Sequence, residues 1–375
     1  MRAGFYQLVL LAAASWLGYE FALNAKANLE AQNITGGFGF LDNTAGFNVN
    51  QSLIPYNESD SYGRVFLVGL LNTLLVSGVG IVLATILGFL VGIARLSPNW
   101  LVARIAGGYV ELIRNLPLLF QILFWYLAVL GALPAPRRSI ALFDAIFLNN
   151  RGIIVPVPIA GQGAGAVAAA FAAGLFATIA VAIWARRRQV RTGRRFPTIL
   201  VACLLLVGLP LLVSAAMGFP IGFQKPELRG FNFVGGIRLI PEFVALLLGL
   251  TIYTAAFIAE VVRAGVLAVP RGQTEAALAL GLRRGMLLRL VVVPQALRVI
   301  VPPLTNQYLN LTKNSSLAVA IGYPDLFAVF AGTTLNQTGQ AIEIIAITMA
   351  VYLSISLATS AFMNWYNAHL RVTER

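Results

Sequence analysis

An apolar segment late in the sequence contains polar residues whose spacing suits a water-filled pathway. Within 301–322, four of them recur at spacings of four, three and one: Asn306, Asn310, Lys313 and Asn314. Residues at these spacings share one face of a helix, and Ser315 adds a hydroxyl beside them. A charge in the middle of a bilayer costs about 2.5–3.5 kcal/mol on insertion scales. The face therefore lines a wet pathway, where Lys313 is available to an anionic substrate group, or it is buried and Lys313 pairs with a carboxylate or with carbonyl groups.

Two further apolar segments hold polar residues with a similar choice of interpretations. Glu111 and Arg114 are three residues apart, so their side chains can pair on one helical face, and Asn115 follows them. This pair forms a seam between two helices, or it belongs to a gate or a substrate contact. Thr251 lies in the segment 242–262, where a hydroxyl bonds more often to the carbonyl four residues earlier than to a ligand.

The sequence offers no arrangement of residues for catalysis. One His and one Cys exclude a His-based metal site, a Ser-His-Asp triad and a disulfide scaffold. The patterns G-x-x-x-x-G-K-[ST], H-E-x-x-H and G-x-S-x-G are absent. We therefore expect a protein that is not an enzyme and binds no cofactor or metal. Any process driven by ATP would need a separate nucleotide-binding subunit.

The composition predicts the elements that position the polar residues. The 375 residues are 58% hydrophobic and 11% charged, whereas soluble domains carry about 25% charged residues. A soluble fold could not bury so much apolar surface, and disordered chains lack such residues. We expect an all-α polytopic transmembrane helical bundle. Stretches of about 20 mostly apolar residues predict about eight spans, at about 6–23, 65–94, 109–131, 166–185, 197–217, 242–262, 301–322 and 342–365.

The distribution of cations predicts the orientation of this bundle. With the N-terminus inside, 17 Arg and Lys residues lie on the inner side and eight on the outer side. The positive-inside rule then makes both termini cytoplasmic. The net charge of +13 and the six arginines between 186 and 195 could suggest nucleic acid or anionic lipid, but a cationic loop between two apolar spans is more simply an orientation signal. The first span is expected to be a retained helix, with a cleaved signal peptide as the alternative.

The segment 270–294 is too polar to lie in lipid and is predicted to lie on the inner side. Thr274 is a candidate N-cap for a short helix, and Gly281 permits the turn that ends it. A second helix over 283–293 is expected to end at Pro294. A small surface helix of this kind is what a membrane subunit needs to receive force from a cytoplasmic partner.

The spacing in this segment resembles a known signature. Glu275-Ala276-Ala277 is followed after three residues by Gly281, and after nine more by Val291-Val292-Val293-Pro294. This resembles the EAA signature of bacterial ABC-importer permeases, which reads E-A-A, three residues, G, nine residues, I-x-L-P, with Val here replacing Ile and Leu. The resemblance implies that seven residues couple the chain to an ATPase: Thr274, Glu275, Ala276, Ala277, Gly281, Arg283 and Arg284.

The resemblance extends over most of the chain. Residues 69–126 and 242–327 are similar to the two halves of polar amino-acid permeases, which implies a five-helix type I importer core. The extra segments resemble those of the larger permease of general L-amino-acid and glutamate/glutamine/aspartate/asparagine importers. Four parts are expected: a first transmembrane helix with a periplasmic loop, the first part of the core, an insertion with two extra transmembrane helices, and the second part of the core with the coupling loop. They comprise residues 1–63, 64–133, 134–240 and 241–375.

The resemblance also implies function and partners. The chain would be the permease subunit of an ATP-driven, binding-protein-dependent importer of polar L-amino acids in the bacterial inner membrane. Its partners would be two copies of an ABC ATPase using ATP and Mg, a second homologous permease, a periplasmic amino-acid-binding protein and the lipid bilayer. An ion- or proton-coupled secondary transporter of small polar solutes is the alternative. Such proteins usually carry acids within the membrane, and the few candidates here lie mostly near predicted span ends: Glu20, Glu111, Glu242, Glu260 and Glu343.

Overall fold

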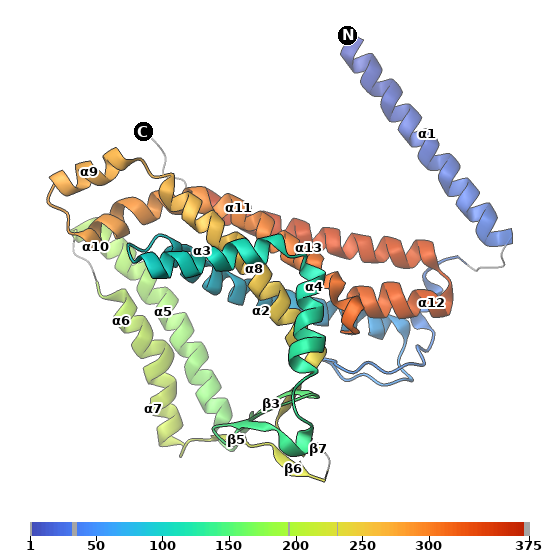
Figure 1. The fold of residues 1–375 in the computed structure, drawn as a ribbon, viewed down its shortest axis with the longest axis horizontal. Coiled ribbons are helices and arrows are strands. Elements are labelled where there is room, and N and C mark those ends of the chain that lie inside the picture. The colour runs from blue at the N-terminus through green and yellow to red at the C-terminus, as the bar shows by residue number, and fades with distance from the viewer. Residues whose placement is uncertain (1, 32–35, 194–195, 231, 371–375) are drawn as a thin grey trace. The chain divides into compact units, whose positions relative to one another are not determined.

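A computed structural model of the chain describes residues 2–31, 36–193, 196–230 and 232–370 (Figure 1). The chain divides into two compact units, residues 1–132 with 240–375 and residues 133–239. Both units are rich in helices, and the strands belong to the second. Arg194 and Arg195 of the predicted cationic segment lie outside the described residues.

Two long helices, α2 (Tyr62–Arg95) and α8 (Pro241–Leu267), pack against each other in the first unit. They approach most closely where α2 carries glycine. A Cβ built on Gly88 or Gly92 would lie 2.6 or 2.8 Å from side-chain atoms of α8. Small residues four apart let helix backbones meet in this way. Both predicted spans are confirmed, and the glycines explain why they lie side by side.

The single span predicted at 109–131 is wrong in shape. The segment forms three elements: α3 (Trp100–Asn115), α4 (Leu118–Leu123) and the π-helical η2 (Phe124–Leu130). The helices before and after the break differ in direction by 107°. Pro117 causes the break, because its ring disfavours helical backbone at Leu116, which is extended with ψ of 129°. Gln121 Nε2 donates 3.0 Å hydrogen bonds to the carbonyls of Ile113 and Leu116 at the break, and the Ile113 carbonyl also accepts a bond from the N–H of Leu116.

The polar segment after α8 forms two helices, but the second does not end at Pro294. The elements are α9 (Arg271–Ala279), α10 (Arg284–Leu287), the π-helical η5 (Leu288–Val292), α11 (Val293–Asn314) and the 3-10 helix η6 (Ser315–Ile321). Pro294 lies in the first turn of α11, where its missing N–H is tolerated, and the wide turn of η5 precedes it. The predicted elements 283–293 and 301–322 therefore form one span of 38 residues.

The segment that precedes α2 caps the same bundle. It includes the 3-10 helix η1 (Phe38–Asp42), and Phe40 lies in a core with Val65, Phe330 and Ile344. The last two residues belong to the elements at the end of the chain: the π-helical η7 (Phe327–Thr334), α12 (Leu335–Thr338) and α13 (Ala341–Leu370). These contacts show that the segment caps the bundle.

The number of spans is close to the predicted eight. Among the described residues, six helices are long and apolar enough to cross a membrane, or seven if the bent pair counts as one span. The difference lies in α1 (Arg2–Ala31), which is helical as predicted over 6–23 but has a short apolar stretch, Val9–Phe21. Polar residues such as Gln7 and Asn24 flank that stretch and limit its length.

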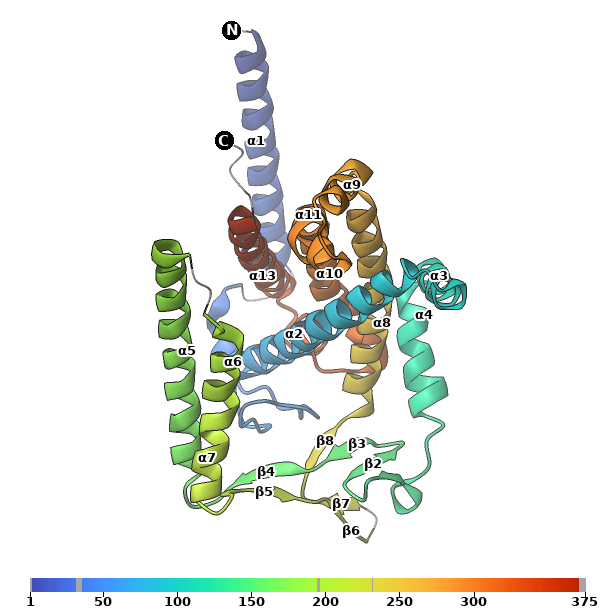
Figure 2. The ribbon, with the colours of Figure 1, turned by 90° about the vertical axis from the view of Figure 1, so that its left-hand side faces the viewer.

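The second unit contains a helical hairpin. Helix α5 (Ala164–Thr192) lies beside a second helix, which comprises α6 (Thr198–Cys203), the π-helical η4 (Leu204–Gly208) and α7 (Leu209–Ala216) (Figures 1 and 2). A Cβ built on Gly174 would lie 2.2 Å from the carbonyl oxygen of Leu205, so glycine is needed where the two helices meet. The predicted spans at 166–185 and 197–217 are confirmed.

Short antiparallel strands and the 3-10 turn η3 (Pro136–Arg138) complete the second unit. One sheet has the order β1 (Ile140–Leu142), β2 (Ile146–Asn149), β3 (Gly152–Val155), β8 (Ile237–Leu239). Two ribbons pair β4 (Val157–Ala160) with β5 (Ile221–Gln224) and β6 (Glu227–Arg229) with β7 (Asn232–Val234). The Pro- and Gly-containing segment 150–166 therefore includes both β3 and β4. Its β-branched residues favour strands, and Pro158 is tolerated because β4 is an edge strand.

Candidate functional site

The polar residues of α11 lie on one exposed side of that helix. Asn306, Asn310 and Lys313 are exposed and Asn314 is half-buried, whereas Leu311 is fully buried. The predicted shared face is therefore confirmed. We call these four polar residues the polar face of α11.

Lys313 has no partner among the residues that the structure describes. Its ammonium group forms no ion pair there, and the side chains of the three asparagines form no hydrogen bonds there. One of the two interpretations is a buried Lys313 that pairs within this chain. The described residues do not form such a pair. A face of this kind is stable in a membrane only where water or the polar groups of another subunit reach it.

Two residues predicted for the pathway lie in the core. Ser315 is fully buried, and its Oγ donates a 2.8 Å hydrogen bond to the Thr312 carbonyl. The tighter turn of η6, which begins at Ser315, takes its side chain away from the polar face. Thr251 is buried, and its hydroxyl has no hydrogen-bond partner in the described part of the chain. The expected bond from Thr251 to the preceding turn is therefore not formed.

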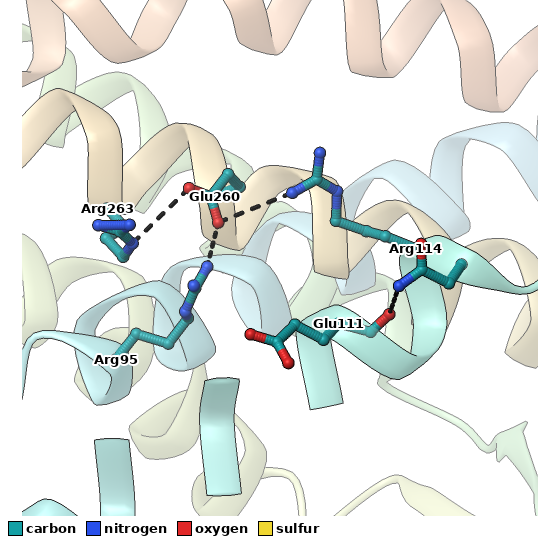
Figure 3. A network of polar contacts seen from close by, with 6 residues as sticks. Arg95, Glu111, Arg114, Glu260 and Arg263 are labelled. Atoms are coloured by element: carbon teal, nitrogen blue, oxygen red, sulfur yellow. Dashed lines mark hydrogen bonds and ion pairs between the residues drawn. The ribbon is translucent and has the colours of Figure 1, made fainter. Parts of the chain in front are cut away.

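Arg114 does not pair with Glu111, so this prediction is wrong. The Arg114 Nη1 lies 3.8 Å from Glu260 Oε2 on α8, and the guanidinium carbon lies 5.2 Å from the centre of the Phe257 ring. Asn115 Nδ2 donates a 2.7 Å hydrogen bond to the Glu111 carbonyl. The Glu111 carboxylate and the Arg114 guanidinium occupy separate positions in Figure 3. The spacing of three allowed an ion pair, but α8 offers Arg114 both a carboxylate and an aromatic ring.

Glu260 is the centre of a charge cluster that also includes Arg95, Arg114 and Arg263 (Figure 3). Arg95 Nη1 hydrogen-bonds to Glu260 Oε2, and Arg263 Nε lies 3.6 Å from Glu260 Oε1. Because Arg95 belongs to α2 and Arg114 to α3, one carboxylate of α8 connects three helices. Sequence reasoning missed this role. The signal for it was Arg263, three residues after Glu260 on the same helical face.

Helix α9 ends in a Schellman motif at Gly281. The N–H of Leu282 donates to the Ala277 carbonyl at 3.1 Å, and the N–H of Gly281 donates to the Leu278 carbonyl at 2.9 Å. Gly281 has φ of +76°, which would cost an L-residue about 1–2 kcal/mol. The predicted turn at Gly281 is therefore confirmed.

The start of α9 differs from the prediction. Pro270 is the N-cap residue, and the helix begins at Arg271. Thr274 thus lies inside the helix and is not its N-cap. Proline is the physical reason, since it ends the preceding helical backbone and its φ of −59° suits the entry into a new helix.

The residues for which the EAA resemblance implies a coupling role, together with their neighbours, divide into a buried inner set and an exposed outer set. Ala277 is buried in a small core with Leu287 and Val292, and Leu282 packs against them. The outer set is exposed: Glu275, Ala276, Arg283 and Arg284. One side of α9 is therefore fixed to the helix that leads into α11, and the other side is free to contact another protein.

The described residues form three candidate sites: the polar face of α11, the capped helix α9 and the charge cluster around Glu260. Within residues 2–31, 36–193, 196–230 and 232–370, no group of three or more His, Cys, Asp or Glu side chains could hold a metal ion. An exposed polar face, a capped surface helix and a charge cluster between helices can guide a polar solute and transmit movement.

Comparisons with known proteins point in the same direction. A family model described as "Binding-protein-dependent transport system inner membrane component" matches residues 179–372. The chain is 53% identical over 374 residues to the general L-amino acid transport system permease protein AapQ of Rhizobium johnstonii, covering 100% of this chain and 93% of that protein. It is 44% identical over 401 residues to the glutamate/glutamine/aspartate/asparagine transport system permease protein BztB of Rhodobacter capsulatus, covering 98% of this chain and 92% of that protein.

Proposed function

The chain belongs to the family of binding-protein-dependent transport system inner membrane components, and we propose that it is the permease subunit of an ATP-driven importer of polar L-amino acids. Two relatives named as amino-acid permeases match it over nearly its whole length, which supports this substrate class. The alternative, an ion- or proton-coupled transporter, would need acids free to titrate within the membrane. Glu260, the acid closest to that description, is already shared by three arginines.

The permease works with other subunits. Membership of the family implies a multi-span protein of the inner membrane that has an ATPase and a binding protein as partners. We take the ATPase to be present in two copies, which use ATP and Mg, and a second homologous permease to complete the pathway. The periplasmic binding protein delivers the amino acid. This chain has no phosphate-binding loop of its own, so hydrolysis takes place in the ATPase.

The single observation that carries this proposal is how α9 is held. Ala277 and Leu282 fix the helix to the small core with Leu287 and Val292, and the Schellman motif fixes its end. A push on the exposed Glu275 side is therefore passed to α10 and α11 as the movement of one rigid piece. Since α11 carries the polar face, a movement of the ATPase changes the position of the pathway wall.

The polar face of α11 is the wall along which the amino acid passes. Its asparagine amides offer both donors and acceptors, and amino acids carry an ammonium and a carboxylate that need such groups. Lys313 contributes either a contact to the substrate carboxylate or an ion pair to the second permease. The variant Lys313→Met separates the two roles, because loss of a substrate contact lowers uptake and loss of an ion pair lowers the yield of the assembled complex.

The orientation follows from the cations. Both termini and α9 lie on the cytoplasmic side, as 17 cations inside against eight outside favour. Residues 134–240 are then an insertion into the permease core, and the strands of this insertion face the periplasm. A cysteine in place of Gln189, in a Cys203→Ala background, should react with a membrane-impermeant thiol reagent only after the cells are opened. Reaction in intact cells would place α9 in the wrong compartment.

Uptake in proteoliposomes tests the proposed function. The full-length chain is reconstituted with the ATPase, the second permease and the binding protein, and uptake of labelled glutamate, glutamine, aspartate and asparagine is measured. We expect uptake that needs ATP on the side of the ATPase and the binding protein on the other side. Uptake driven by an ion gradient in liposomes without the ATPase would contradict the proposal.

A further inference from the structure

A charged groove lies between α2, α3 and α8, beside the charge cluster. Its volume is about 730 Å³, and its lining includes Arg95, Arg104, Glu111 and Arg263. The ends of α2 and α8 form one wall, and α3 forms the other. The proposed transport mechanism uses neither this groove nor Arg104.

The groove contains more positive than negative charge. Three guanidinium groups line it against the carboxylate of Glu111. Glu260 compensates little of this excess, because Arg95, Arg114 and Arg263 all share its one carboxylate. Arg104 is exposed and forms no ion pair with any described residue. Next to a membrane, where charges are poorly solvated, such an excess attracts an anion.

A buried donor in the groove also lacks a hydrogen bond. Arg263 Nε is buried and makes no hydrogen bond in the described part of the chain, although it lies within ion-pair distance of Glu260. An unsatisfied buried donor typically costs about 1–3 kcal/mol. Guanidinium groups bind the oxygens of phosphate and carboxylate groups through paired N–H donors. The groove therefore offers an oxyanion several donors at once.

The backbone of α3 leaves room for a bulky group in this groove. Gly107 and Gly108 both line it, and a Cβ built on either would meet no atom within 4 Å. Glycine inside a helix costs about 1 kcal/mol relative to alanine. No close contact with the described residues requires these two glycines, but a ligand that lies against α3 would.

The neighbouring face of α3 is apolar and exposed. Leu101, Ile105 and Leu112 share one side of the helix and are between 56% and 66% exposed, and Trp100 at its start is 74% exposed. A helix with one charged and one apolar face lies in the membrane interface, where tryptophan is enriched. The occupant that places an oxyanion beside hydrocarbon at this depth is a phospholipid.

We propose that the groove binds the phosphate of an anionic phospholipid. The guanidinium groups of Arg95, Arg104 and Arg263 hold the phosphate, and the acyl chains lie along the apolar face of α3. Glu111 weakens the site by adding a negative charge. A lipid bound here joins the ends of α2 and α8 through Arg95 and Arg263, which also contact Glu260, and joins them to α3 through Arg104. The inference does not depend on what the permease carries.

Native mass spectrometry of bound lipid tests the site. The full-length chain, in the complex with which it co-purifies, is exchanged into nanodiscs of phosphatidylcholine with a minor fraction of phosphatidylglycerol, and the retained lipids are counted. We expect phosphatidylglycerol to be retained selectively. Arg104→Gln should weaken its retention about fivefold, the effect of removing one cation near a membrane surface. Because Arg104 is exposed and unpaired among the described residues, the variant should fold normally.

Two matched variants make the result specific. Arg187→Gln removes an exposed arginine of α5 that does not line the groove and should leave the retained phosphatidylglycerol unchanged. Glu111→Gln removes the opposing carboxylate and should strengthen retention. Opposite effects of Arg104→Gln and Glu111→Gln, together with no effect of Arg187→Gln, are expected of this groove, whereas a general charge effect would make Arg187→Gln as weak as Arg104→Gln.

Excess inorganic phosphate distinguishes the two sources of the oxyanion. Phosphatidylglycerol that stays bound in its presence supports the lipid site. Displacement by phosphate would show a site for a free anion and overturn the proposal. Equal retention in the wild type and Arg104→Gln would also overturn it, as would an absence of retained phosphatidylglycerol because an acidic group of another subunit fills the groove.

Discussion

Helix α8 of the first unit and the α6–α7 helix of the second unit are both apolar enough to cross a membrane, yet their contacts differ. In α8, 61% of the residues in the most apolar stretch are buried within the protein, against 6% in the α6–α7 helix. Helix α8 packs against α2, α3, α4 and α11, whereas α6 and α7 pack mainly on α5. Hydropathy identifies both as spans, but it does not show which one belongs to the transport core.

The side chains of the two helices explain this difference. Helix α8 carries Thr251, Thr254 and Glu260 and meets the glycines of α2. The α6–α7 helix exposes large apolar residues such as Leu204 and Leu212. Small and polar residues are useful only where another helix lies close, because in lipid they lose packing or hydrogen bonds. We infer that α8 and its partners are the working core and that the hairpin anchors the second unit in lipid.

We expect the largest loss of stability from a substitution where α2 and α8 approach most closely. The variant Gly88→Leu would place its Cβ 2.6 Å from Ile258, and overpacking typically costs about 1–3 kcal/mol and occasionally more. We expect a strong loss of folded protein in size-exclusion chromatography. The same change at Gly78 of α2, where a Cβ meets no atom within 4 Å, is the control. Equal yields of the two variants would show that the close packing of α2 and α8 does not stabilise the core.

We expect the next largest loss of stability from a substitution in the charge cluster around Glu260. The variant Glu260→Gln leaves three guanidinium groups around an uncharged amide, and the loss of charged hydrogen bonds should cost about 1.5–3 kcal/mol. In the second unit, Glu227 pairs with Arg229 at 3.3 Å, but both side chains are about 70% exposed. The variant Glu227→Gln should therefore cost less than about 0.5 kcal/mol. Thermal unfolding in detergent compares them, and equal melting temperatures would refute a stabilising role for the cluster.

The polar face of α11 should be distinguishable from its buried side by chemical labelling. In a Cys203→Ala background, Asn310→Cys should react quickly with a small hydrophilic thiol reagent, because this position is exposed on the polar face. Leu311→Cys should react slowly, because Leu311 is fully buried. Added amino acid should change the rate at 310. Equal rates at the two positions would remove the argument for a pathway wall.

We expect the smallest change in stability and uptake from a substitution at Cys203, in the α5–α7 hairpin. This residue is exposed and free, and surface substitutions of this kind change stability by less than about 0.5 kcal/mol. The variant Cys203→Ala should therefore keep both its melting temperature and its rate of amino-acid uptake. If uptake fell while the protein stayed folded, the α6–α7 helix would belong to the transport core and the comparison would fail.

The sequence predicted well those features that short-range chemistry determines. Apolar runs located most of the spans, and Gly281 marked the end of α9 because only glycine adopts its φ without strain. The spacing of Asn306, Asn310 and Lys313 placed them correctly on one face, since helical periodicity alone fixes that arrangement.

Features that depend on contacts between distant segments were not predictable from the sequence. Arg114 pairs with Glu260 instead of Glu111 because α8 packs beside α3. Thr274 resembled an N-cap, but Pro270 starts the helix earlier. Pro117 was a signal for the bend in the third predicted span, yet its 107° angle depends on the packing of α4 against α8.

The most direct test of the account compares ATP hydrolysis and amino-acid uptake in the same proteoliposomes for variants at the end of α9. Gly281→Leu forces a branched residue into the left-handed conformation at φ +76°, so we expect hydrolysis to continue while uptake is lost. Gly281→Asn, which tolerates this conformation, should keep most of the uptake, and Gly285→Ala, at an open position without positive φ, should keep all of it. Uptake by Gly281→Leu at the wild-type rate would contradict the claim that α9 transmits the work of ATP to the pathway.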